Sequence, residues 1–221
     1  MRTVGGSDKG KLRVRNEDSF RFGSFDDGTT WGIVCDGMGG VHGVMLASNI
    51  AINTVSDKVE LCYTHTMPVK SLENLLLSAI TTANVTVFDR GIYDNSLKGM
   101  GTTIVAAVIK DSTACIAHVG DSRAYKISNN GIVQITKDHS LVQEMLDNGQ
   151  ITVGHLQNLY NAGCRTDLVH IVGSRSLNLA IALQHRTKHT LIGIHAAHQS
   201  DTLLTSNRNG GNRSGEEYRT A

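Results

Sequence analysis

The amino-acid sequence predicts an α+β fold in which helices cover β-sheets. Two long segments carry apolar residues at helical spacing, and short runs of β-forming residues precede and follow them. The chain has 221 residues and a formal net charge of +1, which suits a single domain with a sizeable core.

The first strand is expected over the apolar run at residues 31–35, which ends abruptly in one acid, Asp36. Three glycines stand among the next four residues, 37–40. A buried strand closed by glycines brings a carboxylate to the edge of the core, where backbone groups can approach an ion or a phosphate closely. A tight turn with a solvated aspartate has the same pattern, so this segment alone leaves both interpretations open.

Two helices are expected next, over residues 44–59 and 69–88. In the first helix, Leu46, Ile50 and Val55 are expected on the inner face. The only proline, Pro68, stands just before the second helix, where a helix start tolerates it. Apolar residues at helical spacing in the second helix predict a stripe that faces the core, formed by Leu72, Leu75, Leu76, Ala79, Ile80, Ala83 and Val87.

Four short strands are expected after the helices, over residues 100–109, 113–119, 123–128 and 131–135. Turns are predicted at Asp111 and at residues 129–131, where Asn130-Gly131 is a strong hairpin signal. A second acid, Asp121, stands between two of these strands, in the same kind of position as Asp36.

A third group of acids, Glu17 and Asp18, lies near the N-terminus and close to Arg13. Hard divalent cations bind oxygen ligands, and Mg²⁺ usually takes few carboxylates and keeps several waters. The planar guanidinium of an arginine can hold a phosphate through two donors. Acids at strand ends, an arginine and glycine turns together indicate metal-assisted phosphoester chemistry.

Five short motifs follow one another in the first part of the chain. They are Gly10-x-x-Arg-x-x-Asn-Glu-Asp18, Asp36-Gly-Met-Gly-Gly40, Gly99-Met-Gly-Thr-Thr103, Val119-Gly-Asp-Ser-Arg-Ala-Tyr125 and Ile135-Thr-Lys-Asp-His-Ser140. Their content and order resemble the metal-dependent protein phosphatases of type 2C, in particular the bacterial branch. The resemblance implies an α-β-β-α sandwich for this chain.

The resemblance also implies metal-binding roles for the acids. Asp36 would bridge two Mn²⁺ or Mg²⁺ ions, and the carbonyl of Gly37 would bind one of them. Glu17 and Asp18 would orient water molecules on the metals, and Asp121 would serve a third ion that is held more weakly.

The reaction that the resemblance implies is hydrolysis of phosphoserine or phosphothreonine in proteins. A hydroxide that bridges the two ions would attack in line, without a phosphoenzyme, while Arg13 holds the phosphate. The substrates would be phosphoproteins made by a cognate Ser/Thr kinase. His42 stands one place late for the histidine that protonates the leaving alcohol in this family, so it is either that acid or an exposed loop histidine.

Two aspartates that close the metal site in this family have no counterpart after residue 155. One belongs to a Ser-Asp-Gly turn and the other to a late Asp-Asn pair, and neither sequence occurs there. Asp167 and Asp201 are the first candidates to replace them. Without such ligands we expect weak cation binding and feeble or no activity, and we expect open sheet edges where late strands are missing.

Composition divides the chain near residue 155, into a phosphatase-like part at 1–155 and a part without family motifs at 156–221. From His155 onward there are only four of the 20 acids but six of the 10 histidines. These late histidines are expected on the surface and not in a metal site. We interpret 156–221 as the partly disordered end of a truncated or frame-shifted family member, with a genuinely divergent C-terminus as the alternative.

Charge and composition exclude several classes. A net charge of +1 gives no reason to expect a nucleic-acid or membrane partner, and no apolar stretch reaches the length of a membrane span. The polar N-terminus does not resemble a signal peptide. The four cysteines lack paired spacing, so we expect reduced thiols in a cytoplasmic protein. We also expect a monomer.

Two classes of function stay open at this point. The first is an active Ser/Thr protein phosphatase that needs Mn²⁺ or Mg²⁺. The second is a catalytically impaired fragment or pseudophosphatase binding module that keeps the first part of the fold. The other two reading frames of the coding DNA after codon 155 would discriminate between a frameshift and a divergent end.

Overall fold

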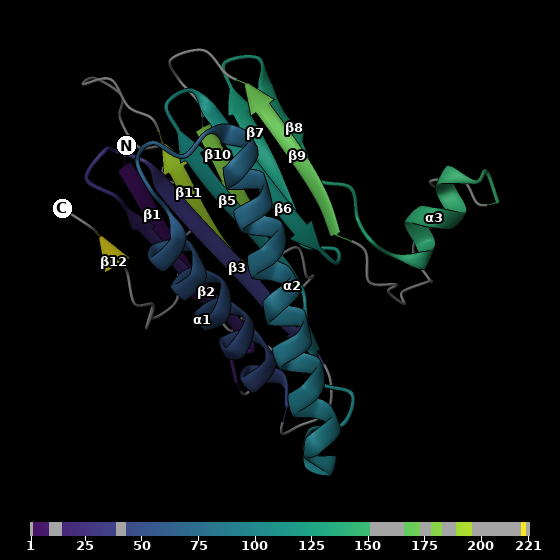
Figure 1. Ribbon diagram of the computed structural model, residues 1–221. Helices are drawn as coiled ribbons and strands as arrows, with labels where there is room; N and C mark the ends of the chain where they lie inside the picture. The colour runs from purple at the N-terminus through teal and green to yellow at the C-terminus, as the bar shows by residue number, and fades with distance from the viewer. Residues whose placement is uncertain are drawn as a thin grey trace, which may run out of the picture.

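Two β-sheets lie face to face, and two long helices cover one of them (Figure 1). The structure is a computed structural model that describes residues 2–8, 15–38, 43–150, 166–172, 178–182, 189–195 and 218–219. Helices α1 (Val44–Cys62) and α2 (Val69–Tyr93) pack side by side on the same sheet. The short helix α3 (Leu141–Asp147) lies away from both sheets in Figure 1.

The sheet under α1 and α2, called the helix-covered sheet below, is antiparallel. Its strands lie in the order β2 (Asp18–Ser24), β3 (Thr30–Met38), β5 (Ile104–Lys110), β6 (Thr113–Val119) and β9 (Thr166–Val172), and β4 (Gly101–Thr102) pairs with β3. The second sheet, called the outer sheet, has the order β12 (Tyr218–Arg219), β1 (Arg2–Asp8), β11 (His189–His195), β10 (Asn178–Ala182), β7 (Arg123–Ser128) and β8 (Gly131–Gln134).

The core has two layers, because the central strands of the helix-covered sheet are buried on both faces. In β3, Trp31, Ile33 and Cys35 pack in the same cluster as the helices, while Val34 belongs to the layer between the sheets. In β5, Ala106 packs in the cluster with the helices, and Ala107 packs in the layer between the sheets. Strands buried on both sides are apolar at nearly every position, which is why residues 31–35 form a continuous apolar run.

The helical predictions are confirmed, with one difference in α1. All seven residues of the stripe predicted on α2 are buried. In α1, Val55 is fully buried, but Leu46 and Ile50 are only half-buried at the edge of the core. The inner face of α1 carries smaller residues, including Ala47 and Ala51, and small side chains let the helix approach the strands closely.

The predicted turns are confirmed, and one predicted strand is interrupted. Asp111 has a positive φ of 53° between β5 and β6, and Gly131 has a φ of 120° after the two-residue loop of the β7–β8 hairpin. The strand expected over 100–109 divides into β4 and β5 at Thr103. Thr103 turns out of the ladder because its side chain and amide bind the backbone of Asp36.

The expectation of missing late strands is wrong for the part of the chain that the structure describes. Strands β10 and β11 fill the middle of the outer sheet, and β9 pairs with β6 at the edge of the other sheet. Residues 177–194 show no clear apolar period, and sheet pairing through backbone hydrogen bonds does not require one. The division of the chain near residue 155 stays a prediction.

The described cysteines agree with the prediction of free thiols. Cys35 and Cys115 are buried, Cys62 is exposed, and none of the three forms a disulfide. Burial raises the pKa of Cys115 to about 11, so this thiol stays protonated at neutral pH. None of the helices among the described residues is both long and apolar enough to cross a membrane.

Candidate active site

Asp18 and Asp36 stand directly opposite one another where β2 and β3 pair. Asp18 is almost fully buried at 9% exposure, and Asp36 is half-buried. Like charges in directly opposed positions destabilise a sheet, and a cation near both carboxylates removes that repulsion. The register therefore creates a place with a preference for positive charge.

The backbone of Asp36 is held from the side of β4 and β5. Its N–H donates to Oγ1 of Thr103 at 3.0 Å, and its carbonyl accepts from the N–H of Thr103 at 2.9 Å. The hydroxyl of Thr102 donates to the same carbonyl at 2.9 Å. We expected Asp36 at the end of the strand, with a tight turn as the alternative, and β3 continues two residues further to Met38, so the carboxylate stands on a paired strand.

The position of Gly37 requires glycine because other backbone groups approach it closely. A Cβ atom there would lie 2.3 Å from the carbonyl oxygen of Val44 and 2.9 Å from that of Glu17. The N–H of Gly37 donates to the carbonyl of Glu17 at 3.2 Å. The start of α1 and the N-terminal acids are thereby packed against the end of β3.

The segment before β2 is fixed by its own Asn16 and by side chains from two elements, β1 and α1. The side-chain oxygen of Asn16 accepts from the N–H of Asp18 at 3.2 Å, and its amide donates to Ser7 of β1 at 2.6 Å. Ser48 of α1 donates to the carbonyl of Glu17 at 2.9 Å. These bonds hold Glu17 and Asp18 at the end of β3 that carries Asp36.

Asp121 lies in the turn between β6 and β7, as the sequence predicted, and this turn is attached to the Asp36 strand. Gly120 has a positive φ of 101°, a conformation that favours glycine. The hydroxyl of Ser122 lies 2.6 Å from that of Thr103, and both side chains are buried. A chain of contacts therefore runs from Asp36 through Thr103 to the residue next to Asp121.

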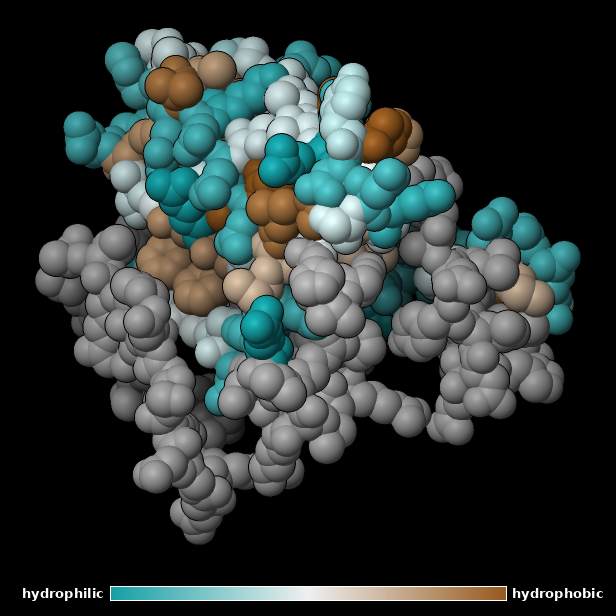
Figure 2. All heavy atoms as spheres, turned by 90° about the horizontal axis from the view of Figure 1, so that it is seen from below, coloured by the Kyte–Doolittle hydropathy of each residue, from teal (hydrophilic) through white to brown (hydrophobic). Residues whose placement is uncertain are grey.

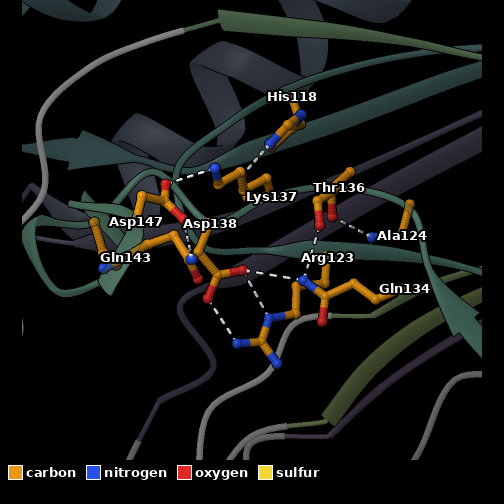
Figure 3. A network of polar contacts seen from close by, with 10 residues as sticks. His118, Arg123, Ala124, Gln134, Thr136, Lys137, Asp138, Gln143 and Asp147 are labelled. Carbon is orange, nitrogen blue, oxygen red and sulfur yellow. Dashed lines mark hydrogen bonds and ion pairs between the residues drawn. The ribbon is translucent and has the colours of Figure 1, made fainter. Parts of the chain in front are cut away.

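Residues 134–140 form a strap that is bound to the start of β7 and to the turn before it, and Figure 3 shows the contacts of Gln134, Thr136 and Asp138. Nε and Nη2 of Arg123 donate to the two carboxylate oxygens of Asp138 at 2.7 and 2.6 Å, and these bonds raise the pKa of Arg123. Thr136 accepts from the N–H of Ala124 at 3.0 Å, and Gln134 donates to the carbonyl of Thr136 at 2.8 Å. The paired guanidinium of Arg123 is thus part of the scaffold.

His139, near the end of the strap, binds both backbone groups of Gly120. The N–H of His139 donates to the carbonyl of Gly120 at 3.0 Å, and the N–H of Gly120 donates to Nδ1 of His139 at 3.3 Å. Since Asp121 follows Gly120 directly, the imidazole of His139 helps to fix the place of that acid.

An apolar cavity of about 240 Å³ lies between α2 and the β4–β5 break. Its lining includes Val87, Phe88, Met100, Thr103 and Gly120. Figure 2 shows apolar side chains gathered among polar ones on the face of the molecule seen from below in Figure 1. The lining is mainly apolar, so this cavity is not a phosphate site.

Five of the predicted site residues lie in the described part of the chain: Glu17, Asp18, Asp36, Gly37 and Asp121. The β2–β3 register and the Thr103–Ser122 contact bring their segments together. Arg13 and His42 lie outside the described residues. Sequence reasoning missed Thr103, Ser122 and His139 as supports, although all three stand inside the motifs quoted above.

The donors present agree in type with a hard divalent cation. They are the opposed carboxylates of Asp18 and Asp36, oxygen groups of the kind that Mg²⁺ and Mn²⁺ bind. Within the described ranges, no group of three or more His, Cys, Asp or Glu side chains is arranged to hold a metal. These residues therefore fit a cation that keeps several of its water ligands. The described residues do not supply all the ligands that a site for two metal ions needs.

The sequence profile of the protein phosphatase 2C family matches residues 10–146, which is more than half of the chain. The chain belongs to the protein phosphatase 2C family. A similar protein is the serine/threonine phosphatase stp of Listeria welshimeri, 38% identical over 146 residues that cover 66% of this chain. The chain spans only 58% of the length of that relative.

Solved structures confirm the protein phosphatase 2C fold. A bacterial serine phosphatase has a TM-score of 0.77 with 23% identity, over 90% of this chain and 99% of that one. The catalytic domain of the phosphatase PstP, solved with two manganese ions, has a TM-score of 0.71 with 21% identity, over 86% of this chain and 97% of that one. The α+β class and the resemblance to bacterial type 2C phosphatases are therefore confirmed.

Proposed function

We propose that this chain hydrolyses phosphoserine and phosphothreonine in proteins with the help of Mn²⁺ or Mg²⁺. The observation that carries the proposal is the opposed pair of carboxylates, Asp18 and Asp36, at the end of a strand held on both sides. Family membership over residues 10–146 supports the same reaction class. The named relatives are serine/threonine phosphatases, and PstP was solved with two manganese ions.

The residues have separate roles in this proposal. Asp36 and the carbonyl of Gly37 hold the cation, and Asp18 and Glu17 orient water around it. Such a cation lowers the pKa of water and neutralises charge on the phosphoryl oxygens. Arg13 holds the phosphate through its planar guanidinium, Asp121 serves a further ion, and His42 is a candidate to protonate the leaving alcohol.

The partners follow from the reaction class. The substrates are phosphoproteins produced by a cognate Ser/Thr kinase, and hydrolysis returns the serine or threonine hydroxyl and inorganic phosphate. A monomeric state and a cytoplasmic location stay predictions from the sequence.

The experiment measures Mn²⁺ binding by calorimetry together with Mn²⁺-dependent hydrolysis of a phosphothreonine peptide. Asp36→Asn removes the central charge, and Asp89→Asn, an exposed position on α2, is the matched control. We expect both binding and hydrolysis to disappear in Asp36→Asn and to persist in Asp89→Asn. Equal Mn²⁺ affinity in the parent protein, Asp36→Asn and Asp89→Asn would contradict the proposed function. If the parent protein binds Mn²⁺ but does not hydrolyse the peptide, the result would favour the catalytically impaired binding module.

A further inference from the structure

We propose that Thr103 is a positioning residue that fixes Asp36 and couples it to the turn that carries Asp121. This inference rests on the proposed function, since it concerns the residues assigned to the cations. It is carried by three contacts of one side chain, which meet at the interruption between β4 and β5.

The first contact replaces a missing part of the sheet ladder. Strand β5 pairs with β3 only as far as Val34, and β4 resumes the pairing at Gly37. In the gap between them, Oγ1 of Thr103 accepts the N–H of Asp36 where a strand partner would offer a carbonyl. The peptide units on both sides of Asp36 are therefore bound by Thr103, which fixes the direction in which the Cα–Cβ bond of Asp36 points.

The second contact is a hydrogen bond between two hydroxyl groups. Oγ1 of Thr103 lies 2.6 Å from Oγ of Ser122, and either hydroxyl can donate, because Thr103 keeps its proton and a second acceptor site while it accepts from Asp36. Thr103 and Ser122 are 2% and 3% exposed, so water does not compete for this hydrogen bond.

The third contact is made by the methyl group of Thr103. A Cβ atom on Gly120 would lie 2.6 Å from Cγ2 of Thr103, so the methyl group packs against the bare Cα of Gly120. Because Gly120 and Ser122 flank Asp121, the hydroxyl and the methyl of one threonine touch both neighbours of that acid. A shift of the Asp121 turn therefore moves Thr103, and with it Asp36.

The test compares variants that remove these contacts one at a time. Thr103→Val keeps the shape and removes the hydroxyl, Thr103→Ser keeps the hydroxyl and removes the methyl, and Ser122→Ala cuts only the link. Thr86→Val, at an exposed threonine of α2, is the matched control. Each protein is measured for Mn²⁺ affinity by calorimetry, for kcat and KM with a phosphothreonine peptide, and for thermal unfolding.

We expect Thr103→Val to lower Mn²⁺ affinity and kcat by about 10- to 100-fold, the range found when partners of metal ligands are removed, with little change in KM. Thr103→Ser should recover most of the loss in affinity. Ser122→Ala should weaken the lower-affinity Mn²⁺ site by about tenfold, and its effect should not add to that of Thr103→Val. Thr86→Val should behave as the parent protein.

The outcomes separate this inference from the proposed function. If Asp36→Asn binds Mn²⁺ as well as the parent, the proposed function fails. If Asp36→Asn loses Mn²⁺ while Thr103→Val keeps parental affinity and kcat, only the role of Thr103 fails. Should Thr103→Val not fold, Ser122→Ala decides the coupling, which is overturned if both Mn²⁺ affinities stay unchanged.

Discussion

The imidazole rings of His118 and His139 stack with their centroids 4.4 Å apart. Nε2 of His118 lies 2.8 Å from the carbonyl of Lys137 and therefore carries a proton, because that carbonyl can only accept. Nδ1 of His139 accepts the N–H of Gly120 and is therefore unprotonated. The stack joins β6 to the strap of residues 134–140, beside the Asp121 turn.

Substitution of His139 should separate the two functions of its ring. His139→Phe keeps the stacking and leaves the buried N–H of Gly120 without an acceptor, which costs about 1–3 kcal/mol. His139→Asn loses the ring but can offer Oδ1 to the same N–H. We expect His139→Phe to be the less stable variant in urea unfolding, and equal stability of the two would show that the hydrogen bond contributes no more than the ring contacts that His139→Asn loses.

Arg13 should act on substrate and not on metal. Arg13→Ala removes a donor that holds the phosphate in the ground state and the transition state alike, so it should mainly raise KM. The measurement is steady-state hydrolysis together with Mn²⁺ calorimetry, and Arg15→Ala, an exposed neighbour, is the control. A normal KM with lost Mn²⁺ binding would contradict this role.

The chain as it stands should have weak activity. Two aspartates expected in the family are missing after residue 155, and an ion with few carboxylate ligands gains little to offset its dehydration. We expect turnover of a phosphothreonine peptide well below the range of about 1–10³ s⁻¹ typical of enzymes. Turnover within that range would mean that other acids act as the metal ligands. Loss of activity in Asp167→Asn or Asp201→Asn would then identify those ligands.

Asp27 should stabilise the folded state at neutral pH, and this contribution should be lost in acid. The hydroxyl of Tyr63 donates to this carboxylate at 2.5 Å and, with the N–H of Thr29, holds the pKa of Asp27 below its ordinary value. A lowered pKa in the folded state stabilises above the unfolded pKa, and the contribution is lost as pH falls through the folded pKa.

The comparison of the parent with Asp27→Asn checks this effect. The difference in melting temperature should be constant from about pH 5 to 7 and should shrink below about pH 4, near the ordinary pKa of an aspartate. Asp26→Asn, at the exposed neighbouring position, is the matched control. A difference that does not change with pH would contradict the link to Asp27.

The sequence predicted the elements whose burial is local and periodic. The stripe from Leu72 to Val87 repeats at helical spacing, and every member is buried. Strand β1 was not predicted, because it contains Gly5-Gly6 and pairs with β11, far away in the sequence. Side-chain spacing contains no signal for such distant backbone pairing.

The acids of the site were predictable and their supports were not. Asp36 and Asp121 stand out because each follows an apolar run. Thr103 and His139 act through hydrogen bonds to backbone groups that are distant in sequence, and a threonine or histidine in a strand or loop usually has no such role. Only the fold shows which backbone groups they reach.

The pairing of Asp18 with Asp36 limits which changes of length this gene can tolerate. Successive side chains of a strand point to opposite faces, so one codon inserted between Ser19 and Ser24 would turn Asp18 away from Asp36. An insertion in the loop at residues 25–29 leaves the register unchanged. Insertions and deletions in proteins descended from this chain should therefore occur in the loop of the β2–β3 hairpin. The number of residues between each of the two acids and that loop should stay constant.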